Sequence, residues 1–149
     1  MVVRQREMCL GARGGWLARR RVTTETLRRV VDHLVGLDPA PDVILATGDL
    51  TDDGTASQYA TLLDVLAPIA DRLLPIPGNH DECPLFRGAF ADVLPGNLAD
   101  DHCSYVIEDH PVRLVGLDNS IPCRHDGRFD PVRERWLDDV LAADPDRPT

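Results

Sequence analysis

The sequence has no long apolar run and few aromatic side chains. Hydrophobic residues make up 43% of its 149 residues, and aromatic residues only 5%. No stretch approaches the roughly 18 consecutive apolar residues that a membrane-spanning helix needs, so we predict no such helix. The length suits one hydrophobic core and is short for two, which favours a single domain.

Lysine is absent, and basic residues are outnumbered. All 16 basic residues are arginine, against 25 aspartates and glutamates, and the formal net charge is −9. An acidic protein repels the phosphates of nucleic acids and of anionic lipids. We therefore expect neither a nucleic acid polymer nor a membrane as a partner.

Closely spaced cysteine pairs are also absent. Cys9, Cys83, Cys103 and Cys123 form no Cys-x-x-Cys motif. The N-terminus has no apolar core of the kind that a secretory signal peptide contains. An even cysteine count in such a chain indicates free thiols rather than a disulfide framework. The cysteine pattern therefore predicts a cytoplasmic protein.

The N-terminal segment differs in charge from the rest. Residues 1–29 hold eight arginines and two acidic residues, whereas residues 30–149 hold eight arginines and 23 acidic residues. Residues 1–21 show neither strand alternation nor a helical stripe. We predict a disordered, arginine-rich leader over 1–21 and a domain over 22–149. The leader is interpreted either as a cleaved presequence or as the product of an arbitrary translation start.

The remaining sequence alternates helical patterns with short apolar strands. Helices are predicted from the cap Thr24 to Gly36, from Thr55 to Ala67 and after the cap Asp130, and strands at 43–46, 73–76, 104–108 and 112–117. Pro75 disfavours a central position for its strand, because proline cannot donate to the ladder. This alternation predicts an α/β layered fold with a largely parallel sheet at its centre.

The last predicted helix has a clear start and an apolar stripe. Asp130 is a good N-cap and Pro131 a good first helical residue. Apolar residues then recur at helical spacing. We expect the buried stripe to comprise Val132, Trp136, Leu137, Val140 and Leu141.

Polar loops follow two of the predicted strands. The strand at 43–46 runs into Gly48-Asp49, and the strand at 73–76 runs into Gly78-Asn79-His80-Asp81. Ligands of open α/β sheets bind at the carboxyl ends of strands, so we expect Asp49 and Asn79 to be neighbours. A carboxylate, an amide oxygen and an imidazole can together bind a hard or borderline metal ion. His80 can also transfer a proton, and Asp81 is a candidate for orienting its ring.

These two motifs, in this order and each after a buried strand, resemble the central signatures of the calcineurin-like metallophosphoesterases. Residues 48–54 and 115–120 are most similar to the bacterial cyclic-nucleotide and glycerophosphodiester phosphodiesterase branch. The resemblance extends from about residue 22 to the last residue. It implies a layered metallo-dependent phosphatase sandwich that hydrolyses a small phosphate mono- or diester by means of a metal-bound hydroxide.

The resemblance also implies roles for particular residues. Asp49 matches the carboxylate that bridges two divalent ions, which are manganese, iron, zinc or cobalt, and Asn79 matches a ligand of the second ion. His80 matches the histidine beside the scissile phosphate, and Asp81 its supporting partner. Two such ions lower the pKa of a bound water and hold the attacking and leaving oxygens.

Two parts of the family pattern are missing from the sequence. The family opens with a strand ending in Asp-x-His, where this sequence has Met8-Cys9-Leu10-Gly11, and it places Gly-His-x-His beyond the point where Thr149 ends this chain. We expect a catalytic domain truncated at both ends, with an exposed sheet edge that permits self-association. The alternative function is a catalytically inactive fragment or pseudoenzyme, at most a weak metal-binding or interaction module.

Other histidines and acids are weaker candidates. Asp100-Asp101-His102 has the Asp-x-His spacing but lies in a polar loop, so we do not expect it to bind metal. His33, His110 and His125 are expected to be solvated. Asp118 ends an apolar strand and has two open interpretations: it lies near the site, or it caps the turn that follows it.

Overall fold

The structure is a computed structural model that describes residues 2–3, 16–121, 124 and 126–149, with the backbone alone for 2–3 and 16–23. Its elements are β1 (Val2–Val3), α1 (Trp16–Val35), β2 (Ile44–Thr47), α2 (Ala56–Leu66), the 3-10 helix η1 (Ala67–Arg72), β3 (Leu73–Ile76), α3 (Cys83–Ala89), β4 (Tyr105–Ile107), β5 (Leu114–Gly116) and α4 (Pro131–Ala143).

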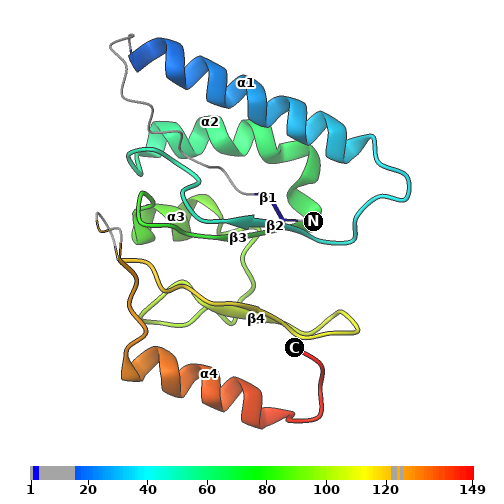
Figure 1. Cartoon of the computed structure of the whole chain (residues 1–149), viewed down its shortest axis with the longest axis vertical. Coiled ribbons are helices and arrows are strands. Elements are labelled where there is room, and N and C mark those ends of the chain that lie inside the picture. The colour runs from blue at the N-terminus through cyan, green and yellow to red at the C-terminus, as the bar shows by residue number, and fades with distance from the viewer. Residues whose placement is uncertain (1, 4–15, 122–123, 125) are drawn as a thin grey trace.

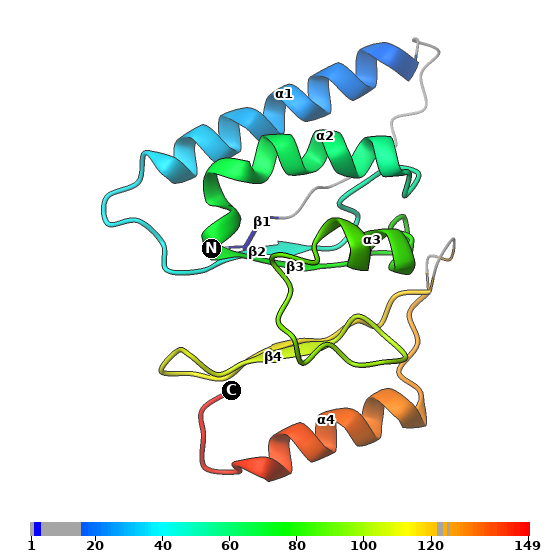
Figure 2. The same cartoon turned by 180° about the vertical axis from the view of Figure 1, so that it is seen from behind.

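The elements stack in four layers (Figure 1). Helices α1 and α2 cover one face of a sheet formed by β1, β2 and β3, and the pair β4–β5 lies on its other side. Helix α4 covers the outer face of β4–β5, and the view from behind shows the same order (Figure 2). This arrangement is the layered α/β sandwich that the sequence predicts.

The strands divide into two sheets rather than one. β1, β2 and β3 are parallel, with Ile44 opposite Leu73, whereas β4 and β5 are antiparallel, with Tyr105 opposite Gly116. The short connection between β4 and β5 explains this, because it cannot make the crossover that parallel strands need. The two sheets meet where the Tyr105 hydroxyl donates to the carbonyl oxygen of Pro75, at 2.9 Å. The prediction of a parallel sheet is therefore confirmed for the first sheet only.

The hydrophobic core lies mainly between the parallel sheet and the helices above it. α1 contributes Val31 and Leu34, which face the strand residues Ile44 and Leu73. Phe86 and Phe90 extend the core around α3, with ring centroids 5.1 Å apart. Burying a large apolar side chain contributes roughly 1.5 to 3 kcal/mol, so this cluster is the main source of stability.

Pro75 lies in β3, which is not the central strand of its sheet, as predicted. Within the described residues, β3 pairs with β2 on one side only and is an edge strand. The missing N–H of proline therefore removes no ladder bond from the centre of the sheet. Its carbonyl oxygen still accepts the bond from Tyr105. A proline at the edge also disfavours pairing with another chain, and self-association through this edge stays a prediction.

The first helix begins earlier than predicted. Thr24 is not its N-cap, because α1 starts at Trp16 and continues through residue 24. The added turns contain leucine, alanine and arginine, which have high helix propensity, and this explains the extension. The helix also crosses the predicted domain boundary at residue 22. The position of that boundary stays a prediction. The leader was predicted to be disordered, but its residues 2–3 form β1, which pairs with β2. For residues 1 and 4–15 the prediction lies outside the described residues.

The predicted cap Asp130 of α4 is confirmed, and α2 also begins with a side-chain cap, Thr55. The Thr55 side chain accepts a hydrogen bond from the Gln58 backbone N–H, and the Asp130 side chain accepts one from that of Arg133. α3 was not predicted, although Glu82 caps it in the same way and Pro84 lies in its first turn. Such caps satisfy N–H groups that lack partners within the helix.

The apolar stripe of α4 is less buried than predicted. All of α4 is described, and none of its residues is fully buried. Val132 and Leu141 are each 39% exposed, and Trp136 is half-buried. The sheet beneath this helix has only the two short strands β4 and β5 in the described residues, which is too little surface to cover the whole stripe.

Candidate active site

The loops that follow β2 and β3 lie against each other. Thr47 pairs with Ile76 at the ends of the two strands, and the Gly48 N–H donates to the carbonyl oxygen of Ile76, at 2.9 Å. A Cβ atom added to Gly78 would overlap the backbone nitrogen of Asp49 and would lie 3.0 Å from its Cα. Glycine is therefore required at this contact. The predicted proximity of Asp49 to the loop that contains Asn79 is confirmed.

Asp49 has an unusual backbone conformation. Its φ is +50°, and that of the preceding Gly48 is +74°. Few residues other than glycine adopt positive φ, and such strained residues concentrate at functional sites. Oδ1 of Asp49 accepts a hydrogen bond from the His80 N–H, at 3.3 Å. The strained turn thus directs the carboxylate toward the second loop.

The imidazole of His80 is oriented by a backbone carbonyl. Its Nδ1 lies 2.7 Å from the carbonyl oxygen of Asp52. A carbonyl oxygen only accepts hydrogen bonds, so Nδ1 must carry the proton in this contact. Nε2 is then the nitrogen that exchanges a proton with a ligand. The ring belongs to the second loop, and the carbonyl that holds it belongs to the first.

Asp81 joins the two loops and is not placed as the partner of the His80 ring. Its side chain is 2% exposed. Its oxygens accept five hydrogen bonds at 2.9 to 3.0 Å, from the N–H groups of Leu50, Thr51 and Gly78 and from the hydroxyls of Thr51 and Tyr59. The predicted support of His80 comes instead from the Asp52 carbonyl. Asp81 is a positioning residue, because a buried carboxylate needs such donors and here they come from both loops.

The charge of Asp81 also affects the pKa of Tyr59. Burial raises the pKa of the Tyr59 hydroxyl, and the nearby Asp81 carboxylate raises it further. A protonated hydroxyl can donate, and it does so to Oδ1 of Asp81 at 3.0 Å. The α2 helix is thereby attached to the loops that carry the candidate site.

Asp49 and Asn79 carry oxygen donors of the kind that a metal site uses. Both residues are half-buried, and they lie on adjoining loops. Carboxylate and amide oxygens suit hard divalent cations. Among the described residues, however, no group of three or more histidine, cysteine, aspartate or glutamate residues is placed to hold a metal ion. The described residues therefore fit part of a metal centre and do not fit a complete one.

The other histidines do not join this site. His33 is exposed on α1, His110 is half-buried, and His125 lies outside the described residues. His102 was expected in a polar loop, yet it is 2% exposed and stacks edge-on against Trp136, with centroids 5.5 Å apart. Its Nδ1 has no hydrogen-bond partner, and burial, followed by the charge of Arg133, lowers its pKa.

His102 should make the folded state sensitive to acid. Its pKa is lowered in the folded state, so below the ordinary value of 6.5 the unfolded chain binds more protons than the folded chain. The free energy of unfolding therefore falls on acidification through this range, by up to about 1.4 kcal/mol per pH unit. Urea unfolding between about pH 7 and pH 5 should show a shallower dependence in His102→Gln. The exposed substitution His33→Gln should retain the wild-type dependence, and equal slopes for all three proteins would contradict this assignment.

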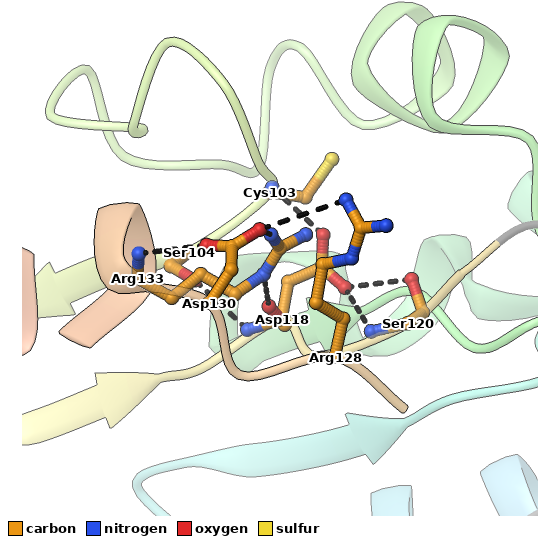
Figure 3. Close-up of polar contacts among 7 residues, drawn as sticks. All are labelled: Cys103, Ser104, Asp118, Ser120, Arg128, Asp130 and Arg133. Carbon is orange, nitrogen blue, oxygen red and sulfur yellow. Dashed lines mark hydrogen bonds and ion pairs between the residues drawn. The ribbon is translucent and has the colours of Figure 1, made fainter. Parts of the chain in front are cut away.

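Asp118 has a structural role (Figure 3). Its Oδ1 accepts bonds from the N–H and hydroxyl of Ser120, and its Oδ2 accepts one from the Cys103 N–H, at 2.9 Å. Its carbonyl oxygen accepts a bond from Arg133, which is also paired with Asp130. Of the two interpretations left open by the sequence, capping of the following turn is confirmed. This network anchors the start of α4 to the end of β5.

Comparison with known proteins identifies the family. The model of the calcineurin-like phosphoesterase family matches residues 22–149. The chain is 34% identical over 123 residues to "Probable glycerophosphodiester phosphodiesterase GpdQ" of Arcobacter nitrofigilis, covering 83% of this chain and 45% of that protein. It is also 34% identical over 121 residues to "Probable cyclic nucleotide phosphodiesterase" of Rhodococcus erythropolis, covering 78% of this chain and 39% of that protein.

A third relative is the 3',5'-cyclic adenosine monophosphate phosphodiesterase CpdA of Pseudomonas aeruginosa. It is 34% identical over 100 residues, covering 67% of this chain and 34% of that protein. The chain thus spans less than half the length of these curated relatives. Of the helices in the described residues, none has both the length and the apolar character to span a membrane. The match over residues 22–149, together with the two adjoining loops, shows that the chain belongs to the calcineurin-like phosphoesterase family.

Proposed function

We propose that this chain contributes the Asp49 and His80 side of a site that hydrolyses a phosphate mono- or diester with the help of divalent metal ions. One observation carries the proposal: the loops after β2 and β3 are in backbone contact, with Asp49 held at positive φ against the loop of Asn79 and His80. Family membership and the phosphodiesterase names of the relatives support it.

Each residue has a separate task in this proposal. Asp49 and Asn79 would hold the metal, which would supply charge neutralisation and an activated water. His80 in its imidazolium form donates the Nε2 proton to the leaving oxygen and becomes neutral, while its Nδ1–H stays bonded to the Asp52 carbonyl. Asp81 touches no substrate and holds the two loops in register. Positioned charge dominates phosphoryl transfer, so this register is essential to the rate.

The alternative is a catalytically inactive module that binds metal weakly. It is favoured by the absence, among the described residues, of any group of three histidine, cysteine or acidic residues that could hold a metal. An incomplete ligand set binds a metal ion less tightly and stabilises less of the charge in the transition state. Asp49 and Asn79 serve as ligands in both proposals, which differ in whether the chain turns over substrate.

Hydrolysis of bis(p-nitrophenyl) phosphate in the presence of manganese distinguishes the two. The proposed function predicts metal-dependent release of nitrophenol, which His80→Ala lowers by about 100-fold in kcat because the proton donor is lost. His33→Ala removes an exposed histidine from α1 and should retain the wild-type rate. A wild-type rate no higher than that of manganese alone would support the inactive module instead.

The finer points are proposals as well. We propose a small phosphate ester as the substrate, of the cyclic-nucleotide or glycerophosphodiester kind that the relatives' names specify. Manganese, iron, zinc and cobalt all suit oxygen and imidazole ligands, and two ions are proposed for the complete site. A cytoplasmic location is proposed from the cysteine pattern alone.

A further inference from the structure

Two cysteine side chains interact at the start of α3. Cys83 is the first residue of α3, and Cys103 lies in the segment that leads into β4. Both are free thiols, Cys83 packs against the core cluster that contains Cys103, and the two side chains interact. Cys83 is half-buried, whereas Cys103 is fully buried in the core. Cys83 is therefore the more accessible residue of the pair, and Cys103 is protected.

A fixed cation accompanies the pair. The Arg87 guanidinium, one turn after Cys83 in α3, interacts with the Cys83 side chain. It also donates to the carbonyl oxygens of Ala99, Asp100 and His102, which immediately precede Cys103. These contacts attach the segment of Cys103 to the helix of Cys83. They hold the two sulfurs together and place a positive charge beside the more accessible one.

The surroundings shift the pKa values of the two thiols in opposite directions. The hydrogen bond from Cys103, and then that from Arg87, lower the pKa of Cys83, although burial and the Asp118 carboxylate oppose the shift. The contact with Cys83, and then burial, raise the pKa of Cys103. In Figure 3 the Cys103 sulfur points away from Asp118, whose carboxylate binds its backbone N–H. A thiolate is the reactive form of cysteine, so Cys83 is the nucleophile of the pair.

We propose that Cys83 and Cys103 form a peroxide-sensitive thiol pair that closes reversibly to a disulfide between α3 and the start of β4. The first step joins the Cys83 sulfur to one oxygen of hydrogen peroxide and breaks the O–O bond. It yields a sulfenic acid and, after protonation of the leaving hydroxide, water. In the second step the Cys103 sulfur attacks that of Cys83, the S–O bond breaks, and the thiol proton leaves with the hydroxide as a second water. This modification is independent of the proposed hydrolysis.

The test uses the full chain with Cys9→Ser and Cys123→Ser, so that only the pair remains. Dilute protein is treated with one equivalent of hydrogen peroxide and analysed by intact mass, thiol titration and peptide mapping. The proposal predicts the loss of two hydrogens per chain and of both titratable thiols, a peptide linking Cys83 to Cys103, and full reversal by dithiothreitol. Added oxygen without a linked peptide, or two thiols that remain titratable, would overturn it.

Single substitutions assign the roles. In this background, Cys83→Ser should consume peroxide about 10-fold more slowly, because the remaining thiol is buried and its pKa is raised. Cys103→Ala should instead react at Cys83 and stop at the sulfenic acid, which dimedone traps. Circular dichroism of each variant confirms that it is folded. Equal peroxide rates for the folded Cys83→Ser variant and its parent would refute the assignment of Cys83 as the nucleophile.

Discussion

Replacing Asp81 by asparagine is expected to lower the free energy of unfolding by about 3 kcal/mol, because the amide group places a donor against other donors. The oxygens of Asp81 accept from three backbone N–H groups and two hydroxyls, and water does not reach them. An NH2 group at either oxygen position would face at least one backbone N–H group and leave it unpaired, because an N–H cannot accept a hydrogen bond. Equilibrium unfolding in urea measures the change.

Tyr59→Phe is the matched control for Asp81→Asn. It removes one of the five donors and leaves the carboxylate bound by the other four, so a loss of about 1 kcal/mol is expected. If Asp81→Asn were no more destabilising than Tyr59→Phe, the carboxylate would not be the group that joins the two loops. The expected ratio therefore tests its role as well as its burial.

Replacing Gly78 by alanine is expected to separate the two loops, at a cost of about 3 kcal/mol of unfolding free energy. The added methyl group would overlap the backbone nitrogen and Oδ1 of Asp49. The overlap is with backbone, which cannot be relieved by rotating a side chain. Metal binding through Asp49 and Asn79 should be lost together with stability, because both ligands depend on this contact.

Gly88→Ala is the control for the change from glycine to alanine. Gly88 lies in α3, and nothing lies within 4 Å of an added Cβ. Alanine favours helix over glycine by roughly 0.5 to 1 kcal/mol, so this variant should be as stable as the wild type or more so. Similar urea midpoints for Gly78→Ala and Gly88→Ala would show that the loops are not in the contact described here.

The proximity of the two loops could be predicted from the sequence. Two short apolar strands followed by Gly-Asp and Gly-Asn-His are sufficient, because parallel neighbours end at the same edge of a sheet. The cap Asp130 was predicted as well, since capping depends on residues close in sequence, and Thr55 caps α2 in the same way. These features depend on local pattern and on the geometry of a parallel sheet.

The direction of individual side chains could not be predicted. Asp81 follows His80 directly, which favours the idea that they interact, yet Asp81 turns into the interior and His80 contacts the carbonyl of Asp52. Both outcomes depend on donors and acceptors about 30 residues away. The interaction between Cys83 and Cys103 is of the same kind, since no spacing rule links these positions.

The predictions of where α1 starts and of how deeply α4 is buried were wrong for different reasons. Capping residues occur inside helices as well as at their ends, so Thr24 alone could not locate the helix start. The apolar stripe of α4 correctly indicated a helix, but the extent of its burial depends on the surface of β4 and β5 beneath it. A helical period predicts which side chains share a face and not how much of that face is covered.

Manganese bound per chain, measured by equilibrium dialysis and elemental analysis, tests most directly whether Asp49 and Asn79 form a metal-binding edge. The wild-type chain should retain manganese at saturating concentration, and Asp49→Ala and Asn79→Ala should both lose it. Asp71→Ala removes an exposed carboxylate from the other end of β3 and should bind like the wild type. Equal binding by the wild type and Asp49→Ala, or no binding by the wild type, would contradict the account.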